Sequence, residues 1–95
     1  MFIIEITYKK SLDQIDQHLT EHKAFLDNGY RNNYFVASGP KVPRTGGIII
    51  SQLTNREKLE EFLKQDPFAI HDVADYQITE FSPTKHHEHF ESFIK

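Results

Sequence analysis

The residue best suited to chemistry is His22, which stands on an otherwise apolar helix face. Apolar residues recur between Ser11 and Asn28 at steps of three, four and seven, as expected for one side of a helix. They are Leu12, Ile15, Leu19 and Leu26, and His22 takes the i+3 position after Leu19. An inward imidazole must be paired or must open onto a cavity. His22 is therefore either a hydrogen-bonded core residue or a general acid–base group.

A second polar feature is Asp66-Pro67-Phe68, which follows a predicted helix. Asp66 can cap a new short turn that has Pro67 at its first position. It can also orient a nearby imidazole and stabilise the charged form of that ring, as carboxylates do in other acid–base pairs. A capping carboxylate still has a free oxygen, so one aspartate can serve both purposes.

Two loops carry residues suited to ligand contact, Ser38-Gly39-Pro40 and Pro43-Arg44-Thr45-Gly46-Gly47. Glycine allows the backbone to approach a ligand closely. Arg44 can bind a carboxylate or phenolate with two hydrogen bonds. A hairpin connection needs the same glycines, and Arg44 can equally be a solvated cation, so both interpretations stay open.

Other histidines raise the question of metal binding. His18 precedes His22 by four residues, and such a pair on a helix can hold zinc. No third ligand has a clear spacing, however. The tail His86-His87-Glu88-His89 is of a kind that binds metals nonspecifically, and we interpret it as a solvated segment. We therefore predict no metal site and no cofactor, since motifs for phosphate loops and serine nucleophiles are also missing from the sequence.

Four strands are predicted from alternating apolar residues and β-branched side chains. They cover residues 2–8, 34–38, 48–53 and 73–81. The third begins with Ile48-Ile49-Ile50, which is apolar on both faces, so we expect it at the centre of the sheet.

Two long helices are predicted between these strands. The first covers residues 11–28, with Ser11 and Gln14 as a capping box and Gly29 just beyond its end. The second starts at Thr54, with Glu57 in another capping box, and ends before Pro67. Its apolar face consists of Leu59, Phe62 and Leu63. Residues 85–95 are expected to form a last helix on Phe90, Phe93 and Ile94.

The order βαββαβ predicts an α+β, ferredoxin-like protomer with an antiparallel four-stranded sheet and two helices on one face. We expect one domain over residues 1–84 and a His-rich tail over 85–95. The other sheet face would be open and partly apolar, which favours a homodimer.

Composition limits the function classes. Of the 95 residues, 38% are hydrophobic and 13% aromatic, too many for a disordered chain. The net charge of −3 and the lack of a basic face argue against nucleic acid as a partner. Without cysteine, disulfides, thiol catalysis and thiolate metal sites are excluded. No apolar run is long enough for a membrane span and no leader is evident, so a cytoplasmic protein is expected.

Taken together, the motifs resemble the YciI-like family in order and spacing. The residues that carry the resemblance are His18-x3-His22, Ser38-Gly39-Pro40, Pro43-Arg44-x-Gly46-Gly47, Asp66-Pro67-Phe68 and Tyr76-x-Ile78-x-Glu80-Phe81. It implies a dimeric α+β barrel with a pocket in each protomer that holds a His–Asp pair, here His22 and Asp66. One branch of this family includes a dehydrochlorinase acting on a chlorinated hydroxyhydroquinone, and the wider fold includes muconolactone isomerases. This chain has Asn33 where many members carry glycine, which puts the shape of that loop in question.

Two functions are compatible with these observations. In the first, the protein is a lyase or isomerase in which His22 moves a proton on a small cyclic or aromatic substrate and Asp66 fixes the ring. The expected substrate contacts are Ser38, Gly39, Pro40, Arg44 and Phe68. In the second, it is a non-catalytic small-molecule binder or a structural homodimer, in which His22 packs and Asp66 only caps.

Overall fold

The computed structural model describes residues 1–94 and contains four strands with helices between them. Its elements are β1 (Phe2–Tyr8), α1 (Leu12–Asp16), α2 (Leu19–Arg31), β2 (Phe35–Pro40), β3 (Gly46–Ser51), α3 (Arg56–Leu63), α4 (Pro67–Ile70), β4 (Ala74–Glu80) and the 3-10 helix η1 (Glu88–Phe93). No helix in this part of the chain is long and apolar enough to cross a membrane.

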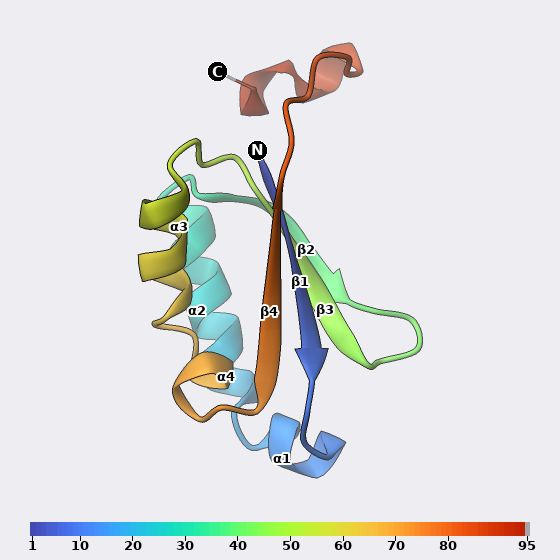
Figure 1. The fold of residues 1–95 in the computed structure, drawn as a ribbon, viewed down its shortest axis with the longest axis vertical. Coiled ribbons are helices and arrows are strands. Elements are labelled where there is room, and N and C mark those ends of the chain that lie inside the picture. The colour runs from blue at the N-terminus through green and yellow to red at the C-terminus, as the bar shows by residue number, and fades with distance from the viewer. Residues whose placement is uncertain (95) are drawn as a thin grey trace.

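The strands form one antiparallel sheet in the order β2-β3-β1-β4. Helices α2 and α3 lie along one face of this sheet, and α1 and α4 sit near one end (Figure 1). The predicted βαββαβ arrangement is therefore confirmed, as is the interior position of β3. Both central strands are rich in β-branched residues, which suit the middle of a sheet.

Alternation along β1 separates the two faces of the sheet. Phe2, Ile4 and Ile6 are buried in the helix-covered core, whereas Ile3 is 37% exposed on the other face. The buried cluster continues through helix and loop residues, which are Ile15, Phe25, Phe35, Ile49, Leu59, Phe62, Leu63, Phe68, Val73 and Ala74. A period of two thus decides which side chains can approach the helices.

The prediction of one continuous helix over residues 11–28 is wrong, because the structure has two helices there. α1 ends at Asp16 and α2 begins at Leu19, and between them the backbone departs from helical angles at His18, with φ −111° and ψ 4°. Leu12 is consequently 45% exposed and does not belong to the apolar stripe. Phe25, three residues after His22, is the buried aromatic of α2.

Gly29 is an interior residue of α2 and not the residue beyond its end. A Cβ atom at this position would lie 2.2 Å from Cδ2 of Phe35. Glycine therefore lets β2 pack directly against the helix. Asn33 has φ 60°, a left-handed conformation that asparagine tolerates better than most residues. The loop before β2 thus accommodates Asn33 in a conformation that otherwise favours glycine.

Several element ends also differ from the predictions. Asn55 caps α3 through a hydrogen bond from the Lys58 amide, in place of the predicted Thr54. β2 continues through Pro40, beyond the predicted end at Ser38, and β3 already begins at Gly46. Ser11 caps α1 by accepting the Gln14 amide, which is one half of the predicted capping box, and α3 ends before Pro67 as predicted.

The tail forms η1 only over Glu88–Phe93 and not a helix over the whole of residues 85–95. It projects beyond the end of the sheet where the N-terminus lies (Figure 1). Lys95, included in the predicted tail helix, lies outside the described residues.

Candidate functional site

His22 and Asp66, 44 residues apart in the sequence, meet between the helices. The distance from His22 Nδ1 to Asp66 Oδ1 is 2.8 Å. The imidazole also stacks on Phe68, with ring centroids 4.0 Å apart and planes 8° from parallel. His22 is 8% exposed. It therefore has one hydrogen-bonded edge and one packed face, which fix its orientation.

Asp66 is held more tightly than its partner. It has no exposed surface, and it is the N-cap of α4, with Oδ1 accepting the Phe68 amide at 3.1 Å. Its other oxygen, Oδ2, accepts a hydrogen bond of 2.5 Å from the hydroxyl of Tyr76 on β4. One buried carboxylate thus joins three elements, α2, α4 and β4. Both functions predicted for Asp66, capping and contact with an imidazole, coexist in the geometry.

The hydrogen-bond pattern indicates which ring nitrogen carries the proton. A carboxylate only accepts hydrogen bonds, so Nδ1 of His22 is the donor toward Asp66. In the neutral ring, Nε2 is then the unprotonated nitrogen. It has no hydrogen-bond partner among residues 1–94, and no unsatisfied polar side-chain atom is fully buried in this part of the chain. Nε2 therefore reaches open space.

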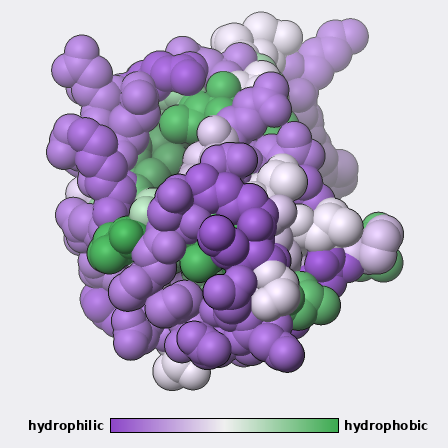
Figure 2. All heavy atoms as spheres, turned by 60° about the horizontal axis from the view of Figure 1, so that its bottom comes forward, coloured by the Kyte–Doolittle hydropathy of each residue, from purple (hydrophilic) through white to green (hydrophobic). Residues whose placement is uncertain are grey.

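That space is a cavity of about 270 Å³ between α2 and the sheet, and His22 lines it. Its apolar wall consists mostly of aliphatic residues, which are Ile6, Leu19, Leu26 and Ile49. Tyr8 completes this wall. The outer surface differs from this lining, since the face at the end that carries α1 and α4 is mostly hydrophilic with only separate hydrophobic patches (Figure 2). The cavity thus combines a largely apolar wall with the imidazole of His22.

Four of the five predicted ligand contacts, Ser38, Gly39, Pro40 and Arg44, lie on the cavity wall. The hydroxyl of Ser38 is 2.6 Å from that of Tyr30. Arg44 is already paired, since its guanidinium lies 2.6 Å from Asp16 and over the ring of Tyr8. This hydrogen bond with Asp16 raises the pKa of Arg44.

The fifth predicted contact, Phe68, does not line the cavity. It lies behind the imidazole and is 1% exposed, so its direct partner is His22. A wall residue that the sequence analysis missed is Lys23, which directly follows His22. No carboxylate within residues 1–94 forms an ion pair with Lys23. Lys23 follows Leu19 by four residues, and this spacing indicates that both lie on the same side of the helix.

His18, the other member of the possible zinc pair, packs against a third histidine. Its ring stacks on His71 at 4.0 Å, while His22 Nδ1 is engaged by Asp66. Among the described residues, the one cluster of three potential metal ligands is His87, Glu88 and His89, all exposed in the tail.

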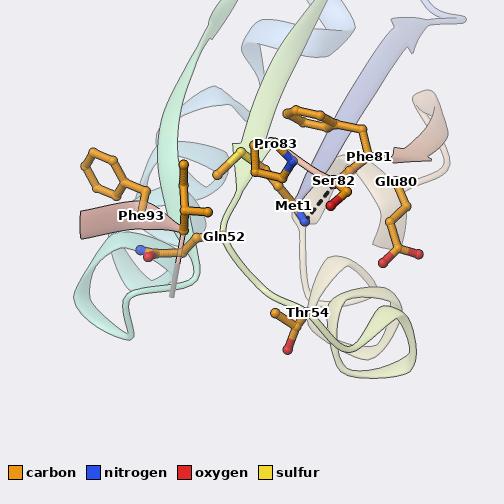
Figure 3. A pocket seen from close by; sticks show the side chains of 9 residues that line it. Met1, Gln52, Thr54, Glu80, Phe81, Ser82, Pro83 and Phe93 are labelled. Atoms are coloured by element: carbon orange, nitrogen blue, oxygen red, sulfur yellow. Dashed lines mark hydrogen bonds between the residues drawn. The ribbon is translucent and has the colours of Figure 1, made fainter. Parts of the chain in front are cut away.

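A larger hollow of about 500 Å³ lies at the other end of the sheet, where the tail passes Met1. Figure 3 shows Met1, Phe81, Pro83 and Phe93 around it, with the Met1 ammonium bonded to the Phe81 carbonyl at 3.2 Å. No histidine lines this hollow. The smaller cavity, which reaches His22, is therefore the better candidate for chemistry.

Comparison with known proteins agrees with this fold. The chain is similar to the 5-chloro-2-hydroxyhydroquinone dehydrochlorinase from Burkholderia phenoliruptrix AC1100, solved in complex with 2,5-dihydroxybenzoquinone. The two share 18% sequence identity with a TM-score of 0.73, over 93% of this chain and 96% of the other. None of the curated protein sequences matches this chain. The model of the YCII-related domain matches residues 1–82, and the chain therefore belongs to the YCII-related family.

Proposed function

We propose that this protein is an enzyme of the lyase or isomerase type, with His22 as its general acid–base group and Asp66 as the partner of that ring. The observation that supports this most directly is that His22 bonds a buried carboxylate through Nδ1 while the same ring lines a cavity. Such a ring is suited to proton transfer, because one nitrogen is fixed and the other is free.

In the proposed reaction, Nε2 takes a proton from a carbon or hydroxyl of the substrate. The electron pair left behind forms a new double bond, and a leaving group departs with its own bonding pair or a different carbon is protonated. The first outcome is an elimination and the second an isomerisation. Asp66 stabilises the imidazolium that exists between the two steps. Neither outcome needs an added oxidant or reductant, so we predict no cofactor.

The size and lining of the cavity favour a single substituted ring as substrate. A cavity of roughly 150 Å³ accommodates benzene, and about 270 Å³ leaves space for substituents. Aliphatic side chains suit the ring faces, while Ser38 and the cations Lys23 and Arg44 suit hydroxyl or acidic groups. The dehydrochlorinase of the same fold acts on a ring of this class, which makes hydroxylated quinones and hydroquinones sensible first probes.

The test compares the wild-type protein with His22→Gln and His86→Gln. The first change removes the ring at the cavity, and the second removes an exposed histidine of the tail. A panel of cyclic acids and phenols, including 5-chloro-2-hydroxyhydroquinone, is screened for binding and for product or chloride release. We expect His22→Gln to bind the substrate but to lose at least about 100-fold in kcat, while His86→Gln keeps full activity.

Full turnover by folded His22→Gln protein would overturn this proposal. Ligand binding without turnover in the wild type would support the alternative of a non-catalytic binder.

We also propose that the open sheet face pairs with a second copy of the chain. Ile3, Ile48 and Ile50 belong to the two central strands, and Ile3 is 37% exposed. Light scattering after size-exclusion chromatography should give the mass of a dimer, and Ile3→Lys should shift it toward monomer. A wild-type monomer at high concentration would contradict this pairing.

A further inference from the structure

Tyr76 is a polar residue of the site that the proposed proton transfer does not use. It lies on β4, opposite Ile6 of β1, and does not line the cavity that His22 reaches. Its hydroxyl donates to Oδ2 of Asp66 at 2.5 Å. Tyr76 therefore contacts the carboxylate on the side away from the imidazole.

The direction of this hydrogen bond is fixed by the state of the phenol. Burial raises the pKa of Tyr76, and the negative charge of Asp66 and the hydrogen bond to it raise it further. Tyr76 thus keeps its proton at neutral pH. A protonated phenol facing a carboxylate oxygen acts as a donor, and such charge-assisted bonds are among the stronger ones in proteins.

The carboxylate needs this second attachment because its own torsion is soft. The terminal torsion of an aspartate side chain has a broad range of allowed values. In this site both oxygens are bound, Oδ1 by the Phe68 amide and the His22 ring, and Oδ2 by Tyr76. Without Tyr76, Oδ2 would be a charged buried atom without a donor. The carboxylate would turn to regain one, at the expense of the bond from Nδ1.

We infer that Tyr76 is the positioning residue of the His22–Asp66 pair. By holding Oδ2, it keeps Oδ1 on Nδ1 of His22 and thereby holds the neutral ring in the tautomer that leaves Nε2 unprotonated toward the cavity. This inference rests on the proposed function for its catalytic meaning, but the tautomer is a property of the free protein. Tyr76 acts through Asp66 and does not touch the cavity itself.

The test is nitrogen NMR of the His22 ring, because protonated and unprotonated ring nitrogens give well-separated signals. Wild type, Tyr76→Phe and Tyr34→Phe are compared at a pH where the ring is neutral in all three. Tyr34→Phe removes the same hydroxyl from a ring that packs on Phe62, and that hydroxyl has no hydrogen-bond partner among residues 1–94. Tyr76→Phe should raise the ratio of the Nε2–H to the Nδ1–H tautomer by roughly tenfold, and Tyr34→Phe should not change it.

A second substitution checks that the hydroxyl, and not the packing of the ring, is responsible. Site-specific incorporation of 3-fluorotyrosine at position 76 keeps the hydroxyl and makes it a stronger donor. The tautomer ratio should then stay at the wild-type value or move further toward Nδ1–H. Once a substrate is identified, Tyr76→Phe should lower kcat more than it changes KM, because the His22 ring is then less well oriented.

A tautomer ratio that changes by less than about twofold in folded Tyr76→Phe protein would overturn the inference. A shift of the tautomer ratio with 3-fluorotyrosine at position 76 that equals the shift with Tyr76→Phe would also overturn it. Neither result depends on turnover, so each is distinguishable from failure of the proposed function. If His22→Gln keeps activity while Tyr76→Phe still shifts the tautomer, the proton-transfer proposal fails and Tyr76 remains the residue that positions the ring.

Discussion

The six histidines of this protein occupy two contrasting regions. In the body, His22 is almost fully buried, bonded to Asp66 and stacked on Phe68. In the tail, His86, His87 and His89 are exposed, and their hydrogen bonds go to neighbouring backbone atoms. Both regions place an acidic residue near a histidine, yet of these two regions only the body buries the pair.

The difference shows that the surroundings of a histidine, and not its presence, decide what it can do. A buried carboxylate with three donors forms a fixed partner for the ring. An exposed glutamate beside exposed histidines interacts through water and is screened by salt. A histidine-rich tract is therefore conspicuous in the sequence and weak as a site, whereas a single interrupted stripe marks the stronger candidate.

The largest effect expected from this contrast is on stability. Asp66→Ala removes an acceptor from His22, Tyr76 and the Phe68 amide, all inside the core. We expect the free energy of unfolding to fall by about 3–5 kcal/mol. Glu88→Ala in the tail should change it by less than about 0.5 kcal/mol. Urea denaturation of both variants measures the change in the free energy of unfolding. Equal decreases in the two variants would contradict the contrast between body and tail.

A smaller effect is expected at alkaline pH. Because the pKa of Tyr76 is raised in the folded protein, the unfolded chain loses this proton first as the pH increases. The contribution of the protonated Tyr76 to the free energy of unfolding is therefore fully present below about pH 10. Above that pH it is lost at about 1.4 kcal/mol per pH unit. Urea denaturation between about pH 9 and 11 should show a steeper decline for wild type than for Tyr76→Phe. Parallel curves would contradict this account of the buried phenol.

The smallest effect is expected from removing the tail. A chain ending at Thr84 loses η1 and its contact near Met1 but keeps every residue around His22. We expect the free energy of unfolding to fall by less than about 1 kcal/mol and the His22 tautomer to stay unchanged. A loss above about 2 kcal/mol would show that the tail belongs to the domain.

The sequence predicted those parts of the site that depend on local patterns. The spacing around Leu19 indicated that His22 points inward, and the Asp66-Pro67 pair indicated a cap. Alternation along β1 predicted the strand but not which of its faces enters the core, because both faces carry apolar residues. The fold followed from the order of these elements, because few arrangements connect them without crossing.

The remaining features depend on contacts between distant segments. The break at Gln17 and His18 has no proline or glycine to announce it. Gly29 suits a helix end or a close approach, and only the position of Phe35 decides between them. The hydroxyl of Tyr76 reaches Asp66 because of the register between β4 and β1, and that register is set by the folded sheet.

The burial of Asp66 also limits the routes that a proton can take. Behind the imidazole the carboxylate has no exposed surface, so a proton on Nε2 can leave only through the cavity. A substrate that fills this cavity closes the exit while it is bound. A deuteron taken from the substrate would then be returned to the same molecule more often than it is exchanged with water. For the proposed reaction, isotope retained within a labelled substrate would thus be a direct record of how tightly the cavity is sealed.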